Sequence, residues 1–211
     1  FYTYQSDRIN RVDLQGRKLP AAWFSVKSIA EDRHGNLFLG TWSTGLLRFK
    51  PSTNTFVQYP QYNEMNSAYS LFIDSKDRLW IGTWGYGIER LSHPLNVRNP
   101  GWKRFEGRGE GFDTYYRIIE DPVSGSIWAC CREGVSILDL NDEDAGFGNY
   151  RRLSGDWSED LTFCNDIFTD RRGNIWMGTL EDGVKHVDTR KSLFAFHPIN
   201  LNANAFPASS V

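Results

Sequence analysis

Aromatic side chains stand beside charged and amide side chains at several points where the apolar runs of the chain are interrupted. Flat rings can stack on the apolar faces of sugars, and neighbouring polar groups can bond the sugar hydroxyls. These residue types therefore predict a surface for a glycan or another small polar ligand. The candidates are Trp42, Trp84, Tyr86, Arg132, Glu181 and Asp182 in one set of short turns, and Tyr62, Asp113 and Trp157 in a set of longer loops.

Loop carboxylates allow a second kind of chemistry. Glu64, Asp113 and Asp160 could supply the acid and base that cleavage of a polysaccharide requires. No motif joins these three residues, so a lyase or glycoside hydrolase is the alternative reading and we expect no catalytic residues.

The cysteines and histidines do not form a recognisable site. Cys130, Cys131 and Cys164 are odd in number and include a neighbouring pair, which is unlike a disulfide framework. We expect them to be small buried residues in strands. The four histidines have no ligand-like spacing to the cysteines, so no metal and no cofactor are expected.

Composition excludes several classes of partner. The chain has 211 residues, 24 basic and 26 acidic side chains and a formal net charge of −2. Without a basic face, nucleic acid is not an expected partner. The apolar runs, about five residues long, are far shorter than a membrane span. Phe1 is not a natural first residue, so we expect the chain to be a piece of a longer protein, and the absence of a secretion signal at this end therefore decides little.

An internal repeat organises the chain. Large aromatic residues recur at Phe38, Trp80, Trp128 and Trp176, at intervals of 42, 48 and 48 residues. This period is typical of a four-stranded propeller blade. In the first full copy, the expected strands a to d cover residues 25–31, 37–41, 46–49 and 55–59. The later copies are expected at 69–73, 79–83, 88–91 and 102–105; at 115–120, 126–130, 135–138 and 150–153; and at 164–169, 174–179, 184–187 and 193–196.

The predicted fold is all-β: a fragment, spanning residues 1–211, of a β-propeller with four-stranded antiparallel blades. We expect a partial blade of three strands at 1–22, full blades at 23–62, 63–107, 108–155 and 156–199, and the start of another at 200–211. A closed ring of five blades would require a longer last strand than residues 209–211 supply. An arc cut from a larger ring is therefore favoured.

Residues that recur in every copy are assigned to the scaffold. The aromatic series should fill the space between blades, and Gly40, Gly82 and Gly178 should permit close approach within strand b. The acidic series Asp32, Asp74, Asp121 and Asp170 should accept backbone N–H bonds of the turn between strands a and b. In the third copy, the Gly-Thr pair is read as Ala129-Cys130.

Residues that vary between copies are the candidates for ligand contact. The loops joining d to a and b to c share one face of a propeller, and both sets vary here. Arg132 is notable because it is read at a position where the other copies have Ser, Gly or Glu. The alternative for Trp42 and Trp84 is that they only cap the adjacent blade.

Two segments resemble the two-component regulator propeller repeat. They are residues 28–49 and residues 170–179, the latter reading Asp-Arg-Arg-Gly-Asn-Ile-Trp-Met-Gly-Thr. The resemblance implies the periplasmic sensor region of a hybrid two-component receptor of the Bacteroidetes type. Such regions often contain two seven-bladed rings, followed by an immunoglobulin-like domain, a membrane helix and histidine-kinase modules. They commonly sense oligosaccharides.

Three functions remain open from the sequence. The first is a non-enzymatic sensor module of an inner-membrane receptor, with a glycan or other small ligand and the remaining blades of the ring as partners. The intact receptor could also form a homodimer. The second is a polysaccharide-cleaving enzyme. The third is a purely structural part of a ring that binds its ligand elsewhere.

Overall fold

The computed structural model describes most of the repeated region. The described residues are 2–5, 8–11, 22–23, 25–42, 45–53, 55–59, 67–106, 113–144, 146–150, 163–181, 183–188, 190 and 193–197. Within them, the regular structure consists of β-strands. No helix in this part of the chain is long and apolar enough to cross a membrane.

The strands form a row of antiparallel sheets in chain order. The first sheet has three strands, β1 (Tyr2–Gln5), β2 (Arg8–Arg11) and β3 (Ala22–Trp23). Four sheets of four strands follow, and we call them the first to fourth blades, each with strands a to d. They are β4 (Val26–Glu31), β5 (Leu37–Thr41), β6 (Leu46–Lys50) and β7 (Thr55–Gln58); β8 (Ala68–Ile73), β9 (Leu79–Thr83), β10 (Ile88–Leu91) and β11 (Trp102–Phe105); β12 (Tyr115–Glu120), β13 (Ile127–Cys131), β14 (Gly134–Leu138) and β15 (Gly148–Tyr150); and β16 (Cys164–Thr169), β17 (Ile175–Thr179), β18 (Val184–Asp188) and β19 (Leu193–His197).

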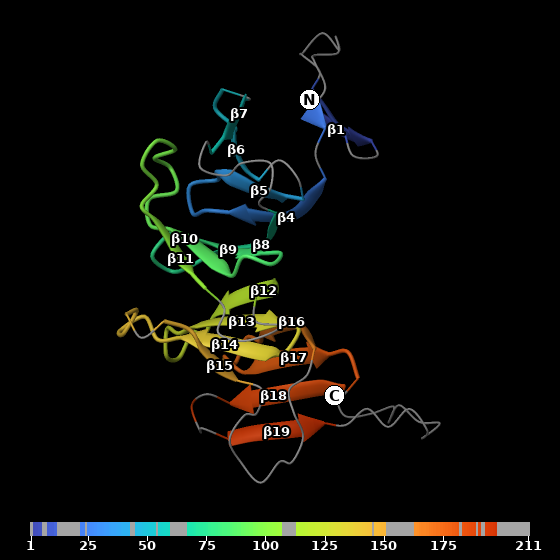
Figure 1. Cartoon of the computed structure of the whole chain (residues 1–211), viewed down its shortest axis with the longest axis vertical. Coiled ribbons are helices and arrows are strands. Elements are labelled where there is room, and N and C mark those ends of the chain that lie inside the picture. Colours follow the sequence, from blue (N-terminus) through green and yellow to red (C-terminus); the bar gives the residue numbers. More distant parts are fainter. Residues whose placement is uncertain are drawn as a thin grey trace.

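Each blade is a meander whose sequential strands pair with one another. The blades follow one another along the long axis of the molecule, with β4, β8, β12 and β16 as neighbouring strands (Figure 1). The predicted all-β architecture of four-stranded antiparallel blades, as a fragment of a propeller, is confirmed.

Most strand ends agree with the prediction to within a residue. The exception is strand d of the third blade, expected at 150–153 and found at Gly148–Tyr150. Strand β3 (Ala22–Trp23) spans the predicted boundary between the partial blade and the first full blade. The other domain boundaries stay predictions, and the expected stub at 200–211 lies outside the described residues.

Three of the four recurring aromatic residues, Phe38, Trp80 and Trp128, fill the space between blades, as predicted. Trp80 is fully buried and packs with Tyr115, Ile118 and Phe147 of the third blade. Phe38 packs in the same way against the second blade, and Trp128 packs against the fourth. Trp176 is only partly buried and stacks on His186 of its own blade, with ring centroids 4.5 Å apart.

The recurring aspartates hold the turn between strands a and b, which confirms the predicted role. Asp74 Oδ1 accepts bonds from the backbone N–H groups of Lys76 and Arg78, both at 2.9 Å. The other oxygen, Oδ2, accepts the indole N–H of Trp80 at 2.7 Å. Asp170 repeats this second bond with Trp176 at 3.0 Å. One carboxylate therefore fixes both a turn and the aromatic residue that fills the next interface.

The third blade departs from this arrangement because its a–b turn is one residue longer. Asp121 Oδ2 accepts the Ser124 hydroxyl at 2.6 Å and the Ser124 backbone N–H at 3.1 Å. The indole nitrogen of Trp128 is buried without a hydrogen-bond partner among the described residues. The inserted residue redirects the carboxylate away from the ring that it holds in the other Trp-containing blades.

Glycines in strand b allow the next blade to come close. A Cβ at Gly40 would overlap the carbonyl oxygen of Ala68 in the second blade. A Cβ at Gly82 would overlap the Ser70 hydroxyl and lie 2.8 Å from the Tyr115 carbonyl oxygen of the third blade. The predicted close approach is thus present at both interfaces. At Gly178 the nearest described atom would be 3.9 Å away.

The predicted pairing of Ala129-Cys130 with the Gly-Thr positions is wrong by one residue. Cys130 pairs with Arg117 in the register in which Gly82 pairs with Ser70. Cys131 therefore occupies the Thr83 position, and its Sγ donates to the Gly134 carbonyl as Thr83 Oγ1 donates to the Gly87 carbonyl. Two residues, Arg132 and Glu133, separate the paired ends of strands b and c in this blade.

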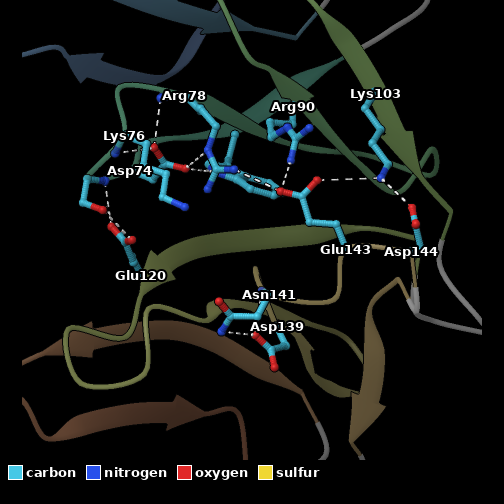
Figure 2. A network of polar contacts seen from close by, with 12 residues as sticks. Asp74, Lys76, Arg78, Arg90, Lys103, Glu120, Asp139, Asn141, Glu143 and Asp144 are labelled. Atoms are coloured by element: carbon cyan, nitrogen blue, oxygen red, sulfur yellow. Dashed lines mark hydrogen bonds and ion pairs between the residues drawn. The ribbon is translucent and has the colours of Figure 1, made fainter.

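The loop between strands c and d reaches back onto the preceding blade. In the second blade, the Leu95 carbonyl accepts a bond from Arg48 at 2.7 Å, and the Pro94 carbonyl accepts the hydroxyl of Tyr59. In the third blade, this loop places Glu143 among cations of the second blade, as Figure 2 shows.

Glu143 is the centre of an ionic network between the second and third blades. Its Oε1 lies 2.5 Å from Arg90 Nη1 and 3.0 Å from Arg78 Nη1, and its Oε2 lies 3.8 Å from Lys103 Nζ. Partial burial acts to raise the pKa of Glu143. The charge and bonding of Arg90, Arg78 and Lys103 outweigh burial and lower the pKa below its usual value.

Substitution of Gly82 tests the close approach of the blades. We expect Gly82→Ala to destabilise the chain by about 1–3 kcal/mol, because the new methyl group displaces the Tyr115 backbone. Gly178→Ala is the matched control, since its methyl group would make only ordinary contacts. Urea denaturation of both variants measures the difference, and equal losses would contradict the interface explanation.

The network at Glu143 predicts a pH-dependent stability. A folded-state pKa below the unfolded value stabilises the fold at pH values above the unfolded pKa, about 4.3, and this stabilisation is lost as pH falls through the folded pKa. We expect Glu143→Gln to lower the free energy of unfolding by about 1 kcal/mol at pH 7, with the difference shrinking as the pH falls below about 4.3 and lost below the folded-state pKa.

Asp144→Asn is the control for this measurement, because the Asp144 side chain is fully exposed and lies 4.0 Å from Lys103. Denaturation at several pH values should show no comparable effect for Asp144→Asn. A Glu143→Gln deficit that is constant from pH 7 to pH 3 would show that lost packing, and not ionisation, is responsible.

Candidate ligand-binding surface

Backbone hydrogen bonds to the neighbouring blade fix the conformation of the turn between strands b and c. In the second blade, Gly85 and Gly87 adopt positive φ angles of 87° and 81°. Their N–H groups donate to the Asp113 carbonyl of the third blade, at 3.1 and 2.9 Å. Glycine suits this conformation because it has no Cβ. Trp84 and Tyr86, which alternate with these glycines, are left 44% and 45% exposed.

A β-bulge in strand a of every full blade supplies the second part of this surface. The pairing register shifts between Ala68 and Ser70 in β8 and between Tyr115 and Arg117 in β12. A bulge adds an unpaired residue and redirects its side chain. The bulged residues of the four blades are Lys27, Tyr69, Tyr116 and Asn165.

Turn and bulge residues meet in a continuous group that we call the aromatic row: Trp42, Tyr69, Trp84, Tyr116 and Phe163. The ring centroids of Trp42 and Trp84 are 5.3 Å apart, those of Trp84 and Tyr116 are 6.2 Å apart, and those of Tyr116 and Phe163 are 6.2 Å apart. Tyr69 lies 5.4 Å from Trp84. The row therefore crosses from the first blade to the segment that enters the fourth.

A cation lies over the ring at each end of the aromatic row. Lys27 Nζ is 5.5 Å from the centre of the Trp42 ring, and the Arg132 guanidinium is 5.9 Å from the centre of the Phe163 ring. Glu133 Oε1 lies 3.9 Å from Arg132 Nε. The Arg132 side chain is 64% exposed. The row thus offers apolar faces and hydrogen-bond donors together.

Phe163 is held in an unusual backbone conformation at the end of the row. Its φ of 51° is unfavourable for a residue with a bulky side chain. Its N–H donates to the Arg132 carbonyl at 2.7 Å, and its carbonyl accepts the Leu180 N–H at 3.0 Å. These bonds to two b–c turns stabilise the strained residue and stack its ring on Tyr116, with 12° between the ring planes.

Tyr116 of the row stays protonated. Burial raises the pKa of Tyr116, and the nearby Arg132 charge opposes this shift. Burial also raises the pKa of Tyr115, which is bonded to Ser136 beneath the surface. Tyr116 is therefore available as a neutral hydrogen-bond donor.

The structure brings three of the predicted residues to this row: Trp42, Trp84 and Arg132. Trp42 and Trp84 each contact rings of the next blade, yet 41% and 44% of these residues remain exposed. Arg132 occupies the position of Trp42 and Trp84. The interpretation that compared it with Ser, Gly and Glu was wrong by one residue, because Cys131 and not Cys130 occupies the Thr83 position.

Other predicted residues lie elsewhere or cannot be placed. Tyr86 makes no ring contact with the row among the described residues, and Glu181 is exposed in the turn of the fourth blade. Asp113 contributes its backbone carbonyl to the turn of the second blade. Tyr62, Asp182 and Trp157, and the alternative carboxylates Glu64 and Asp160, lie outside the described residues.

Sequence reasoning missed Tyr69 and Tyr116 because it considered only loops, and it did not select Phe163, which lies in the loop directly before β16. A signal was present: the residue before Ser28, Ser70, Arg117 and Asp166 varies from copy to copy, as Lys, Tyr, Tyr and Asn. Variation within a repeated strand therefore selects Tyr69 and Tyr116, whereas it gives no signal for Phe163. Among the described residues, no group of three or more His, Cys, Asp or Glu side chains could hold a metal ion.

One family model matches the chain, over residues 64–85, and its description is two component regulator propeller. The chain carries a two-component regulator propeller repeat. The matched segment covers β8, β9 and the beginning of the turn that contains Trp84. No curated protein sequence matches the chain.

Solved structures share the fold at low sequence identity. The extracellular domain of the putative hybrid two-component system BT3049 from B. thetaiotaomicron is 18% identical, with a TM-score of 0.65 over 92% of this chain and 24% of that one. PorZ, a surface component of the type-IX secretion system of Porphyromonas gingivalis, is 17% identical, with a TM-score of 0.64 over 93% of this chain and 33% of that one. The chain therefore spans between a quarter and a third of these proteins.

An enzyme also shares the fold. Virginiamycin B lyase from Staphylococcus aureus is 14% identical, with a TM-score of 0.64 over 85% of this chain and 57% of that one. At these identities, the similarities establish the propeller fold and do not by themselves assign an activity.

Proposed function

We propose that this chain is part of an extracytoplasmic sensor propeller that binds an oligosaccharide and belongs to a two-component receptor in the inner membrane. The observation that carries the proposal is the aromatic row, whose exposed rings and flanking cations cross the blades on one face. The regulator propeller repeat and the similarity to an extracellular receptor domain support the sensor role.

The chemistry of the row fits sugar recognition. Exposed indole rings provide large apolar faces with little conformational entropy to lose, and the Tyr116 hydroxyl, Lys27 and Arg132 provide polar contacts. Because successive rings come from different blades, an oligosaccharide lying along the row would contact several blades at once.

The proposed role is non-enzymatic. Of the three carboxylates considered for acid/base chemistry, only Asp113 lies in the described part, and it is exposed. A glycosidase needs a second carboxyl group at a defined separation across the bond to be cleaved. Incubation with polysaccharides, followed by chromatography of the products, should show no cleavage.

Removal of an exposed ring from the row tests the proposal. We expect Trp84→Ala to weaken oligosaccharide binding by about tenfold or more, because a central aromatic contact typically contributes more than 1 kcal/mol. A glycan array would first select the ligand. Titration calorimetry would then measure the affinity of the full chain and of its Trp84→Ala variant for that ligand.

Val123→Ala is the matched control, since Val123 is 48% exposed but lies in an a–b turn, which is at the other end of the blade from the b–c turns. It should bind as the unmodified chain does. Equal affinity of Trp84→Ala and the unmodified chain for a glycan would exclude the aromatic row as the binding site.

A further inference from the structure

Cys130 stands at a position where the first, second and fourth blades have glycine. Its register with Arg117 matches that of Gly40 with Ser28 and Gly82 with Ser70. In the first two blades this position faces the first residue of strand a in the next blade. Gly40 faces Ala68, and Gly82 faces Tyr115.

Cys164 is the residue that the repeat places opposite Cys130. It begins β16 and pairs with Thr179, as Ala68 begins β8 and pairs with Thr83. Both cysteines are fully buried in the apolar cluster between the third and fourth blades. Their juxtaposition thus follows from the blade geometry and is found in the core.

Cys131 points the other way. Side chains alternate along a strand, and Cys131 lies in the cluster between the second and third blades, where its Sγ donates to the Gly134 carbonyl. The neighbouring pair Cys130 and Cys131 is therefore turned to opposite interfaces, and only Cys130 faces Cys164.

The separation of the backbones at this position suits a disulfide. A Cβ built at Gly82 would lie 3.0 Å from the Cβ of Tyr115. Disulfides need Cβ atoms about 3.5–4.5 Å apart. Cys130 and Cys164 occupy the equivalent positions at the next interface and lie in one buried cluster, so the repeat places their Cβ atoms close to this range.

We propose that Cys130 and Cys164 form a disulfide that joins the third and fourth blades when the chain folds in an oxidising compartment. The compartment rests on the proposed extracytoplasmic location, whereas the pairing rests on the blade geometry alone. Both thiols are free in the structure. This assignment departs from the sequence-based expectation that the cysteines are only small buried residues.

The bond forms by exchange with a small disulfide such as oxidised glutathione. One cysteine thiolate attacks the small disulfide, giving a mixed disulfide and releasing one glutathione thiol. The second cysteine thiolate then attacks the mixed disulfide, which closes the protein bond and releases the other glutathione thiol. Two cysteines are oxidised, one small disulfide is reduced to two thiols, and the two cysteine protons pass to the released thiolates or to solvent.

The exchange must occur before the two blades have closed. Burial, with a further contribution from Cys164, raises the pKa of Cys130, so the reactive thiolate is disfavoured in the folded chain. The disulfide should therefore form during refolding and only slowly once the chain is folded. Once formed, it should raise the melting temperature by roughly 5–10 °C, because it links distant segments of the unfolded chain.

The test is refolding of the full chain in mixed reduced and oxidised glutathione. Free thiols are then alkylated, and a tryptic digest is analysed by mass spectrometry without reduction. We expect peptide 118–132 joined to peptide 153–171, which contains Cys164. Because peptide 118–132 holds both Cys130 and Cys131, variants must assign the bond.

Cys130→Gly, which restores the residue of the other blades, should abolish the joined peptide, whereas the matched variant Cys131→Ser should retain it. Cys164→Ala should abolish the joined peptide as well. Agreement between the two variants would show that the loss does not come from misfolding of one of them. Absence of the joined peptide from the refolded chain, or its survival in Cys130→Gly, would overturn the proposal. Neither outcome depends on glycan binding, so failure of the proposed function and failure of this inference are distinguishable.

Discussion

The close approach of strand a in one blade to strand b of the blade before it is the constraint on which the rest of this structure depends. At Gly40 and Gly82 the two backbones come so near that even a methyl group would collide with the next blade. The space farther out along the blade is wider, and Phe38, Trp80 and Trp128 fill it. Small residues at one position and large aromatic residues at another thus set the angle between successive blades.

The same constraint positions the candidate ligand surface. Because the a strands of successive blades are neighbours, the bulge of one blade lies beside the b–c turn of the blade before it. Tyr69 consequently meets Trp42, and Tyr116 meets Trp84. The aromatic row has no counterpart within a single repeat, since each of its contacts between turn and bulge requires two blades in place. Ligand recognition at the row would therefore depend on the integrity of the interfaces beneath it.

The third blade shows how a repeat accommodates local change. An extra residue in its a–b turn turns Asp121 toward Ser124 and leaves the Trp128 indole without that acceptor. A short b–c turn places Arg132 where the first and second blades have Trp, and Cys130 replaces the glycine at the close approach. The blade retains its strands and its apolar interfaces, because packing of the aromatic residue does not require the indole bond.

The sequence by itself determined the period, the four-stranded blades, the turn role of Asp32 and Asp74, and the burial of Phe38 and Trp80, because each is a local pattern repeated at equal spacing. It also selected Trp84 and Arg132 as variable positions on one face. Only the tertiary structure decided the place of Tyr116 and Phe163. The row joins side chains of different blades, and contacts between blades are not encoded in the spacing of residues within one blade.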